Sequence, residues 1–136
     1  MKSIEKENFL FLVDTEKTKD YYKTNSVCNC SNCRNFSIQI KTISPRLTSF
    51  LSDFGIDICR PDNSTDIEIG NYIDYLFVGY TVIGSILNNG TYETDIENYH
   101  ITISNDNTPN NWFPNEQKEN CFFVSITGIT LPIILK

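Results

Sequence analysis

The stretch Asn32–Gly55, NCRNFSIQIKTISPRLTSFLSDFG, decides the fold of the first half of the chain. Apolar residues recur three and four positions apart on both sides of its proline, which is the spacing of a buried helix face. They are Cys33, Phe36, Ile40 and Ile43 before the proline and Leu47, Phe50, Leu51 and Phe54 after it. Pro45 suits a first helical turn with Ser44 as N-cap, and Gly55 suits the position after a helix end. The pattern predicts a helix over residues 32–42, a kink, and a second helix that ends at Gly55.

Shorter elements are predicted before this unit. Residues 8–13 fit a short strand or the start of a helix. Asp14 or Thr15 is a candidate N-cap of a short helix that runs to Tyr22. The polar, cysteine-rich residues 24–31 predict a loop.

After Gly55 the pattern changes to strands. Residues 56–65 predict a loop, and alternating residues predict a strand over Asp66–Gly70. Residues Ile73–Leu87 are β-branched and aromatic, which favours a long strand. Asn89-Gly90 is typical of a type I′ hairpin turn, so a single return strand is expected over residues 91–104.

The last third of the chain predicts a long polar loop over residues 105–120 and a strand over residues 121–127. Residues 128–136 are expected to form an edge strand or a tail, since Pro132 suits only a sheet edge. Helices come first and strands afterwards. The order predicts one α+β domain over residues 1–136, with the helix–kink–helix unit packed on an antiparallel β-sheet meander.

Composition limits the classes of function. The chain has 136 residues, no alanine and a net charge of -6. Phosphate binding along a nucleic acid needs a basic face, so nucleic acid is excluded as the main ligand. The longest apolar stretch is too short to span a membrane, and no targeting segment is visible, so a cytoplasmic protein is expected. Cytosolic disulfides are uncommon, so the five cysteines are expected to be thiols or metal ligands.

The unusual motif of the chain is C-x-C-x-x-C, formed by Cys28, Cys30 and Cys33. Thiolates at this spacing can reach one tetrahedral metal ion, and zinc is the expected metal. Cys59 is the preferred fourth ligand, with Cys121 and His100 as alternatives. Three unligated thiols, with Cys33 packed in the apolar helix face, are the other interpretation. A redox-active dithiol is a further one, because a helix N-terminus and the adjacent Arg34 would both lower the pKa of a thiol.

Several segments around this motif resemble a small bacterial domain family of uncharacterised function. The resemblance is carried by the C-x-C-x-x-C-R-N-F motif of residues 28–36, by Phe54-Gly55-Ile56-Asp57, by Arg60-Pro61-Asp62, and by residues 129–132. It implies a compact single domain without an assigned activity, and it supplies no catalytic residues to carry over to this chain.

No catalytic residues are predicted. His100 is the single histidine, and it falls on a predicted strand without a carboxylate at an obvious orienting position. The glycines of residues 79–84 have the spacing of a phosphate loop but lack its lysine, so no nucleotide cofactor is expected. Asp53, Asp57 and Asp62 follow the second helix and are interpreted as a solvated loop. The chain is therefore expected not to be an enzyme.

Trp112 and Phe113 are two large aromatic residues in the polar loop, between Pro109 and Pro114. They are candidate partner-binding residues, because rigid aromatic anchors dominate many protein interfaces. Capping of the core is the alternative role. The leading prediction is a non-enzymatic, acidic, cytosolic protein-binding module, and one version of it is an immunity or inhibitor protein that neutralises a basic protein. The alternative is a zinc- or thiol-dependent protein centred on the cysteine cluster.

Overall fold

Three helices and eight strands form the part of the chain that the structure, a computed structural model, describes: residues 1–105 and 120–134. The helices are α1 (Thr15–Thr24), α2 (Ser31–Ile43) and α3 (Pro45–Ser52). The strands are β1 (Lys2–Lys6), β2 (Phe9–Val13), β3 (Asn63–Ile69), β4 (Tyr72–Ile86), β5 (Tyr92–Ile96), β6 (Tyr99–Ser104), β7 (Cys121–Thr127) and β8 (Ile129–Pro132). The predicted α+β class with an antiparallel sheet is confirmed.

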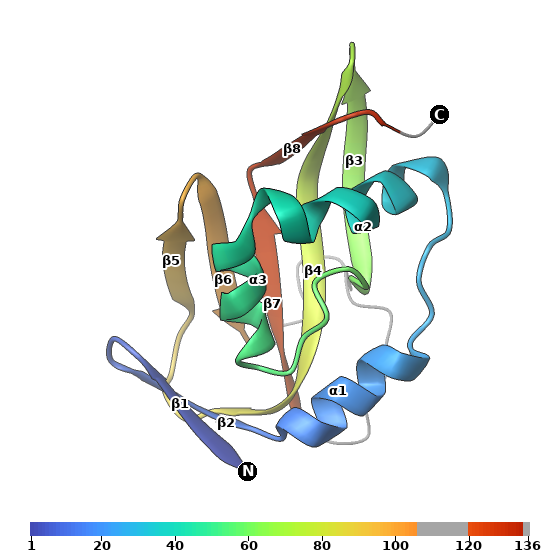
Figure 1. The fold of residues 1–136 in the computed structure, drawn as a ribbon. Coiled ribbons are helices and arrows are strands. Elements are labelled where there is room, and N and C mark those ends of the chain that lie inside the picture. Colours follow the sequence, from blue (N-terminus) through green and yellow to red (C-terminus); the bar gives the residue numbers. More distant parts are fainter. Residues whose placement is uncertain (106–119, 135–136) are drawn as a thin grey trace.

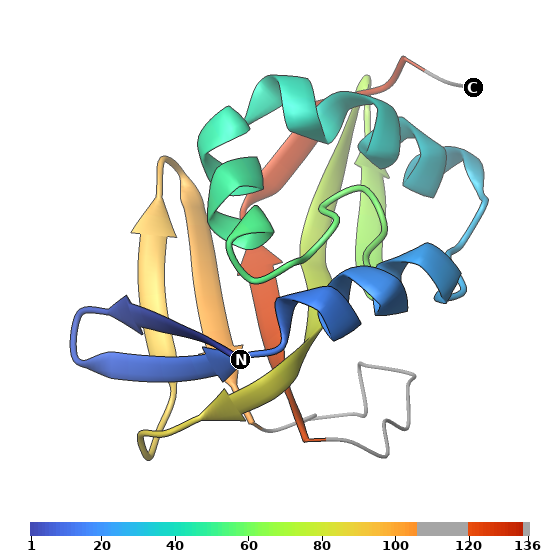
Figure 2. The ribbon, with the colours of Figure 1, turned by 60° about the horizontal axis from the view of Figure 1, so that its bottom comes forward.

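Strand β4 is the element on which the sheet is assembled. It pairs antiparallel with β3 and β8 along its first part, with β7 along its middle, and with β2 at its end. The sheet runs in the order β1-β2-β4-β7-β6-β5, with β3 and β8 attached to β4 (Figure 1). Aromatic contacts connect β2, near one edge of the sheet, to β5 at the other edge, because Phe9 and Phe11 of β2 both pack against Tyr92 of β5. The sheet is therefore strongly curved (Figure 2).

The helices begin where the sequence predicts. Asp14 caps α1 by accepting a hydrogen bond from the Lys17 N–H at 3.0 Å. Ser44 caps α3 by accepting from the Leu47 N–H at 3.3 Å, and Pro45 occupies the first turn. Since the Ser44 N–H also bonds to the Ile40 carbonyl at the end of α2, one residue ends one helix and begins the next. This confirms the predicted kink.

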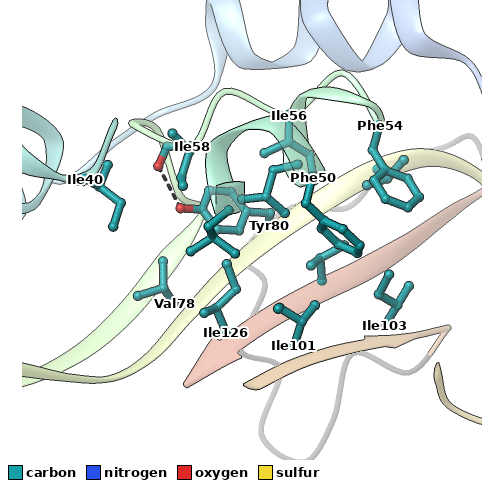
Figure 3. Close-up of a cluster of buried hydrophobic side chains, with 14 of the residues drawn as sticks. Ile40, Phe50, Phe54, Ile56, Ile58, Val78, Tyr80, Ile101, Ile103 and Ile126 are labelled. Atoms are coloured by element: carbon teal, nitrogen blue, oxygen red, sulfur yellow. Dashed lines mark hydrogen bonds between the residues drawn. The ribbon is translucent and has the colours of Figure 1, made fainter. Parts of the chain in front are cut away.

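All three helices lie over the same face of the sheet (Figures 1 and 2). Ile40 of α2 and Phe50 of α3 meet Tyr80 of β4 and Ile101 of β6 in the core between the two layers (Figure 3). Tyr80 is fully buried, and its hydroxyl donates a hydrogen bond to the Ile58 carbonyl at 2.7 Å. That bond satisfies a polar group that would otherwise destabilise the core.

The predicted hairpin at Asn89-Gly90 is wrong. Strands β4 and β5, which flank it, do not pair with each other, and β5 pairs with β6 instead. The predicted single strand over residues 91–104 is therefore two strands joined at Glu97-Asn98, where Glu97 has a φ of 56°. Asn-Gly favours a tight turn whatever follows it. Here β7 occupies the edge of β4 that the return strand would need.

Two further strands differ from the prediction. Strand β1 was not expected, and it pairs with β2 through a two-residue turn at Glu7-Asn8. Strand β3 begins at Asn63, within the predicted loop, and has a register shift between Thr65 and Asp66. The polar residues that begin β3 carry little strand signal, and pairing with β4 determines their conformation. No helix among the described residues is long and apolar enough to cross a membrane.

We expect Gly84→Ala to destabilise the protein by more than about 2 kcal/mol, because a close backbone approach adds to backbone strain. Gly84 has a φ of 153°, and a Cβ atom there would lie 2.0 Å from the Leu12 carbonyl oxygen of β2. The control is Gly90→Ala, since φ is 98° there and no atom lies within 4 Å of the added Cβ. Urea unfolding measures both variants. Equal losses of stability would show that contact with β2 is not the cause.

Candidate metal centre

The N-terminus of α2 positions the cysteine motif. Cys30 is the N-cap of α2, and its sulfur accepts a hydrogen bond from the Cys33 N–H at 3.4 Å. A spacing of three residues at a helix start places two side chains on the same side of the first turn. Cys28 lies two residues earlier, in the extended segment that leads from α1 to α2. Local geometry therefore brings Cys30 and Cys33 together, and Cys28 joins them from the segment before the helix.

The three sulfur atoms form a group that could hold a metal ion. The Sγ atoms of Cys28, Cys30 and Cys33 all lie within 4.8 Å of one another. Zn–S bonds of about 2.3 Å in tetrahedral geometry place sulfurs about 3.8 Å apart, so a shift of about 1 Å is enough to close the site. Cys28 and Cys30 are exposed, whereas Cys33 is half-buried. An ion bound here would be open to solvent on one side.

A cavity of about 190 Å³ adjoins the three thiols. Ser64 and Asp66 of β3 also line it, with the Ser64 Oγ 4.0 Å from the Cys33 Sγ, and Cys59 lines it from the segment before β3. Asn32, between the cysteines, donates to the Asp66 carboxylate at 2.5 Å and accepts from the Tyr75 hydroxyl at 2.5 Å. These two bonds join the start of α2 to β3 and β4. The tertiary fold therefore holds the cysteine segment against the sheet.

The environment pushes the pKa values of two thiols in opposite directions. The hydrogen bond from the Cys33 N–H lowers the pKa of Cys30, because it stabilises the thiolate. Burial, together with the neighbouring sulfurs of Cys30 and Cys28, raises the pKa of Cys33. The arrangement therefore favours the thiolate form of Cys30 at the helix start. Cys33 beside it favours the neutral thiol, and a cation nearby would favour its thiolate form instead.

Cys59 lines the same cavity but is not part of the sulfur group. Its thiol donates a hydrogen bond to the Ser37 carbonyl at 3.4 Å, and burial raises its pKa. Cys121 packs beside Phe77 and Phe123 on β7, and burial raises its pKa also. Both residues therefore have environments that suit neutral thiols.

Asp62 is a half-buried residue that the sequence alone assigns to a solvated loop. Its carboxylate lines the cysteine cavity and accepts hydrogen bonds from the hydroxyls of Tyr21 and Thr81. Burial raises the pKa of Asp62, and the hydroxyl bonds oppose that shift. Asp57 instead accepts from the Cys59 N–H at 3.0 Å, and Asp53 is exposed near Lys6. The three aspartates thus have separate roles, and no local sequence signal distinguishes Asp62.

His100 has two carboxylate partners, so the expectation that it lacks an orienting carboxylate is wrong. Its Nδ1 lies 2.8 Å from Asp95, and its Nε2 lies 3.0 Å from Glu93. The pairing of β5 with β6 places Asp95 directly opposite His100. The sequence predicts a single strand that contains all of these residues, so it does not predict a contact between them across two strands. His100 is distant from the cysteine motif in the fold, since it lies at the far side of the sheet on β6.

The candidate partner-binding residues Trp112 and Phe113 lie outside the residues that the structure describes. Their predicted role stays a prediction.

We expect His100 to stabilise the fold more at low pH than at high pH. The Asp95 and Glu93 carboxylates raise the pKa of the ring above its ordinary value. The stabilisation is therefore present below about pH 6.5 and is lost as the pH rises through the raised folded-state pKa. Urea unfolding of wild type and of His100→Gln, at one pH below and one pH well above about 6.5, measures the difference in their free energies of unfolding. That difference should be at most about 1 kcal/mol, because the ion pairs are exposed. A difference independent of pH would contradict this assignment.

Comparisons of the chain with protein families, with curated proteins and with solved structures find no match. The chemistry of the site is therefore argued from its own geometry. That geometry consists of three adjacent thiols at a helix start, beside a cavity that carboxylates also line.

Proposed function

We propose that this protein binds one thiophilic metal ion, Zn²⁺, through the thiolates of Cys28, Cys30 and Cys33. The proposal depends on one observation, the approach of the three sulfur atoms to within 4.8 Å of one another. Three ligands from one short segment need little ordering on binding, because the first turn of α2 already orients two of them.

Charge around the site supports a cation. Asp62 and Asp66 contribute carboxylates to the cavity beside the thiols, and Cys30 already has a lowered pKa. A divalent ion would offset the repulsion among three neighbouring thiolates, which is why thiol ligands release protons when they bind zinc. Three thiolates would leave the fourth position of a tetrahedral zinc site for water or an exchangeable ligand. Cys59 is a structural thiol in this proposal, since it donates to a backbone carbonyl.

A test of this proposal is metal analysis of protein purified without a histidine tag. We expect about one equivalent of zinc in the wild type, as for a structural or binding site with three thiolates. Cys28→Ser, Cys30→Ser and Cys33→Ser should each lose most of the metal. Cys59→Ser and Cys121→Ser are matched controls, because both thiols are half-buried and lie outside the sulfur group.

Two outcomes would contradict the proposal. Loss of metal in Cys59→Ser would instead support a four-cysteine site, as the sequence alone suggests. A wild-type protein that takes up no zinc, but in which Cys30 is alkylated rapidly at neutral pH, would point to a reactive dithiol.

We also propose that the outer face of the β3–β4 hairpin binds a basic protein, as the acidic charge of the chain leads us to expect. The observation that favours this second function is a group of exposed apolar side chains, Ile67, Ile69, Tyr72 and Leu76, which are 50%, 59%, 53% and 42% exposed. Ile69 and Tyr72 are directly paired across the two strands. Asp74, opposite Ile67, adds negative charge to this face. Inhibition of the partner is one form that such binding could take.

Charge placed on this face should abolish capture of the partner. Ile69→Lys should lose a stoichiometric protein that wild type captures from a native lysate at low salt, because a buried lysine is costly in an apolar interface. Ile38→Lys is the control, since Ile38 is 57% exposed on α2. Equal capture by both variants, or no stoichiometric protein with wild type, would count against the proposal.

A further inference from the structure

A second, larger cavity lies on the other side of the 57–62 segment from the cysteine cavity. It is an open groove of about 470 Å³ between the exposed side of α1 and the segment that follows α3. Three cationic side chains line it, those of Lys19, Lys23 and Arg60. The chain as a whole has a net charge of -6 and only 11 basic residues. The groove therefore gathers positive charge in a protein that is otherwise acidic.

Arg60 is the residue that makes this groove more than a pair of surface lysines. Its side chain is half-buried, and its Nε and Nη2 atoms donate to the side chain and backbone of Asn25 at 3.2 Å and 2.9 Å. Asn25 is buried and donates in return to the Arg60 carbonyl at 3.3 Å. The guanidinium is thus held in one orientation. Arginine held in this way is suited to a planar or tetrahedral oxyanion.

The described residues provide no carboxylate within ion-pair distance of Arg60. Asp57 is the acidic residue of the groove, and its carboxylate instead accepts a hydrogen bond from the Cys59 N–H at 3.0 Å. The guanidinium hydrogen bonds only to groups without a formal charge, so its charge is offset by no more than the partial negative charge at the C-terminus of α1. The remaining charge is available to a ligand in the groove that Arg60 lines.

Lys19 and Lys23 lie one turn apart on α1. Their partners within the helix are Glu16 and Asp20, at 3.8 Å and 3.5 Å, in exposed pairs. Exposed pairs of this kind contribute little free energy, so both ammonium groups can turn to a ligand at small cost. The groove can therefore present a fixed guanidinium and two movable ammonium groups to one anion.

We infer that this groove binds a small, multiply charged oxyanion, of the phosphate or polycarboxylate class. Arg60 supplies the oriented hydrogen-bond donors, and Lys19 and Lys23 neutralise the remaining charge. The groove is large enough to admit a small-molecule anion. This site is separate from the cysteine site and does not depend on a bound metal.

The test is a titration of the ¹⁵N-labelled full-length chain with inorganic phosphate, and in a second arm with citrate, in low-salt buffer. We expect shifts confined to residues 19–25 and 52–60, including the Arg60 Nε–H. Arg60→Gln should weaken binding about tenfold or more, as expected for loss of a charge-assisted bond. The double variant Lys19→Gln/Lys23→Gln should weaken binding by a similar factor. It changes only exposed side chains, so a loss of binding in it does not arise from misfolding, as it could in the Arg60 variant. The tighter of the two anions identifies the class.

The matched controls are Lys41→Gln and Arg46→Gln, which remove exposed cations outside the groove and should leave binding unchanged. Cys30→Ser should also bind phosphate as wild type does, which separates this site from the metal centre. The inference is overturned if neither anion shifts these residues at about 10 mM. It is also overturned if the groove variants and the control variants bind equally well.

Discussion

The pairing of β4 with four other strands is the constraint on which the rest of this structure depends. Because β4 is 15 residues long, it spans both the part of the sheet under α2 and the part that the N-terminal hairpin joins. Gly84 permits β2 to approach it, and Tyr80 connects it to the loop that carries Ile58 and Cys59. That loop lines the cysteine cavity beside α2 and the groove beside α1.

Both candidate sites therefore depend on one half-buried segment with polar side chains, residues 57–62. Residues 57–62 place Cys59 and Asp62 at one cavity and Arg60 at the other. Each of these polar groups finds a partner, so the segment can be partly buried without a large desolvation cost. The result is an uneven distribution of charge. Cysteine thiols, Asp62 and Asp66 line the cavity beside α2, whereas Lys19, Lys23 and Arg60 outnumber Asp57 in the groove beside α1.

Local patterns predicted the elements whose signals are local. The kink between α2 and α3 follows from Ser44 and Pro45, and the core face of both helices follows from their spacing. The predicted hairpin at Asn89-Gly90 is wrong because distant segments compete to pair with the same strand. Here β7 pairs with the edge of β4 that the return strand would need. The same error concealed the partners of His100, since Asp95 is opposite it only when the return strand folds back on itself.

The sequence by itself determined the helix–kink–helix unit, the α+β class and the nearness of Cys30 to Cys33, since a helix N-cap and the residue three positions later are close in any fold that forms that helix. Only the tertiary structure decided that Cys59 lines the same cavity without joining the sulfur group, that Asp62 is half-buried beside that cavity, and that Arg60 lines a groove with Lys19 and Lys23. The physical reason is sequence separation. Those contacts join segments that chain geometry leaves independent, and they are made by the packing of helices on the sheet.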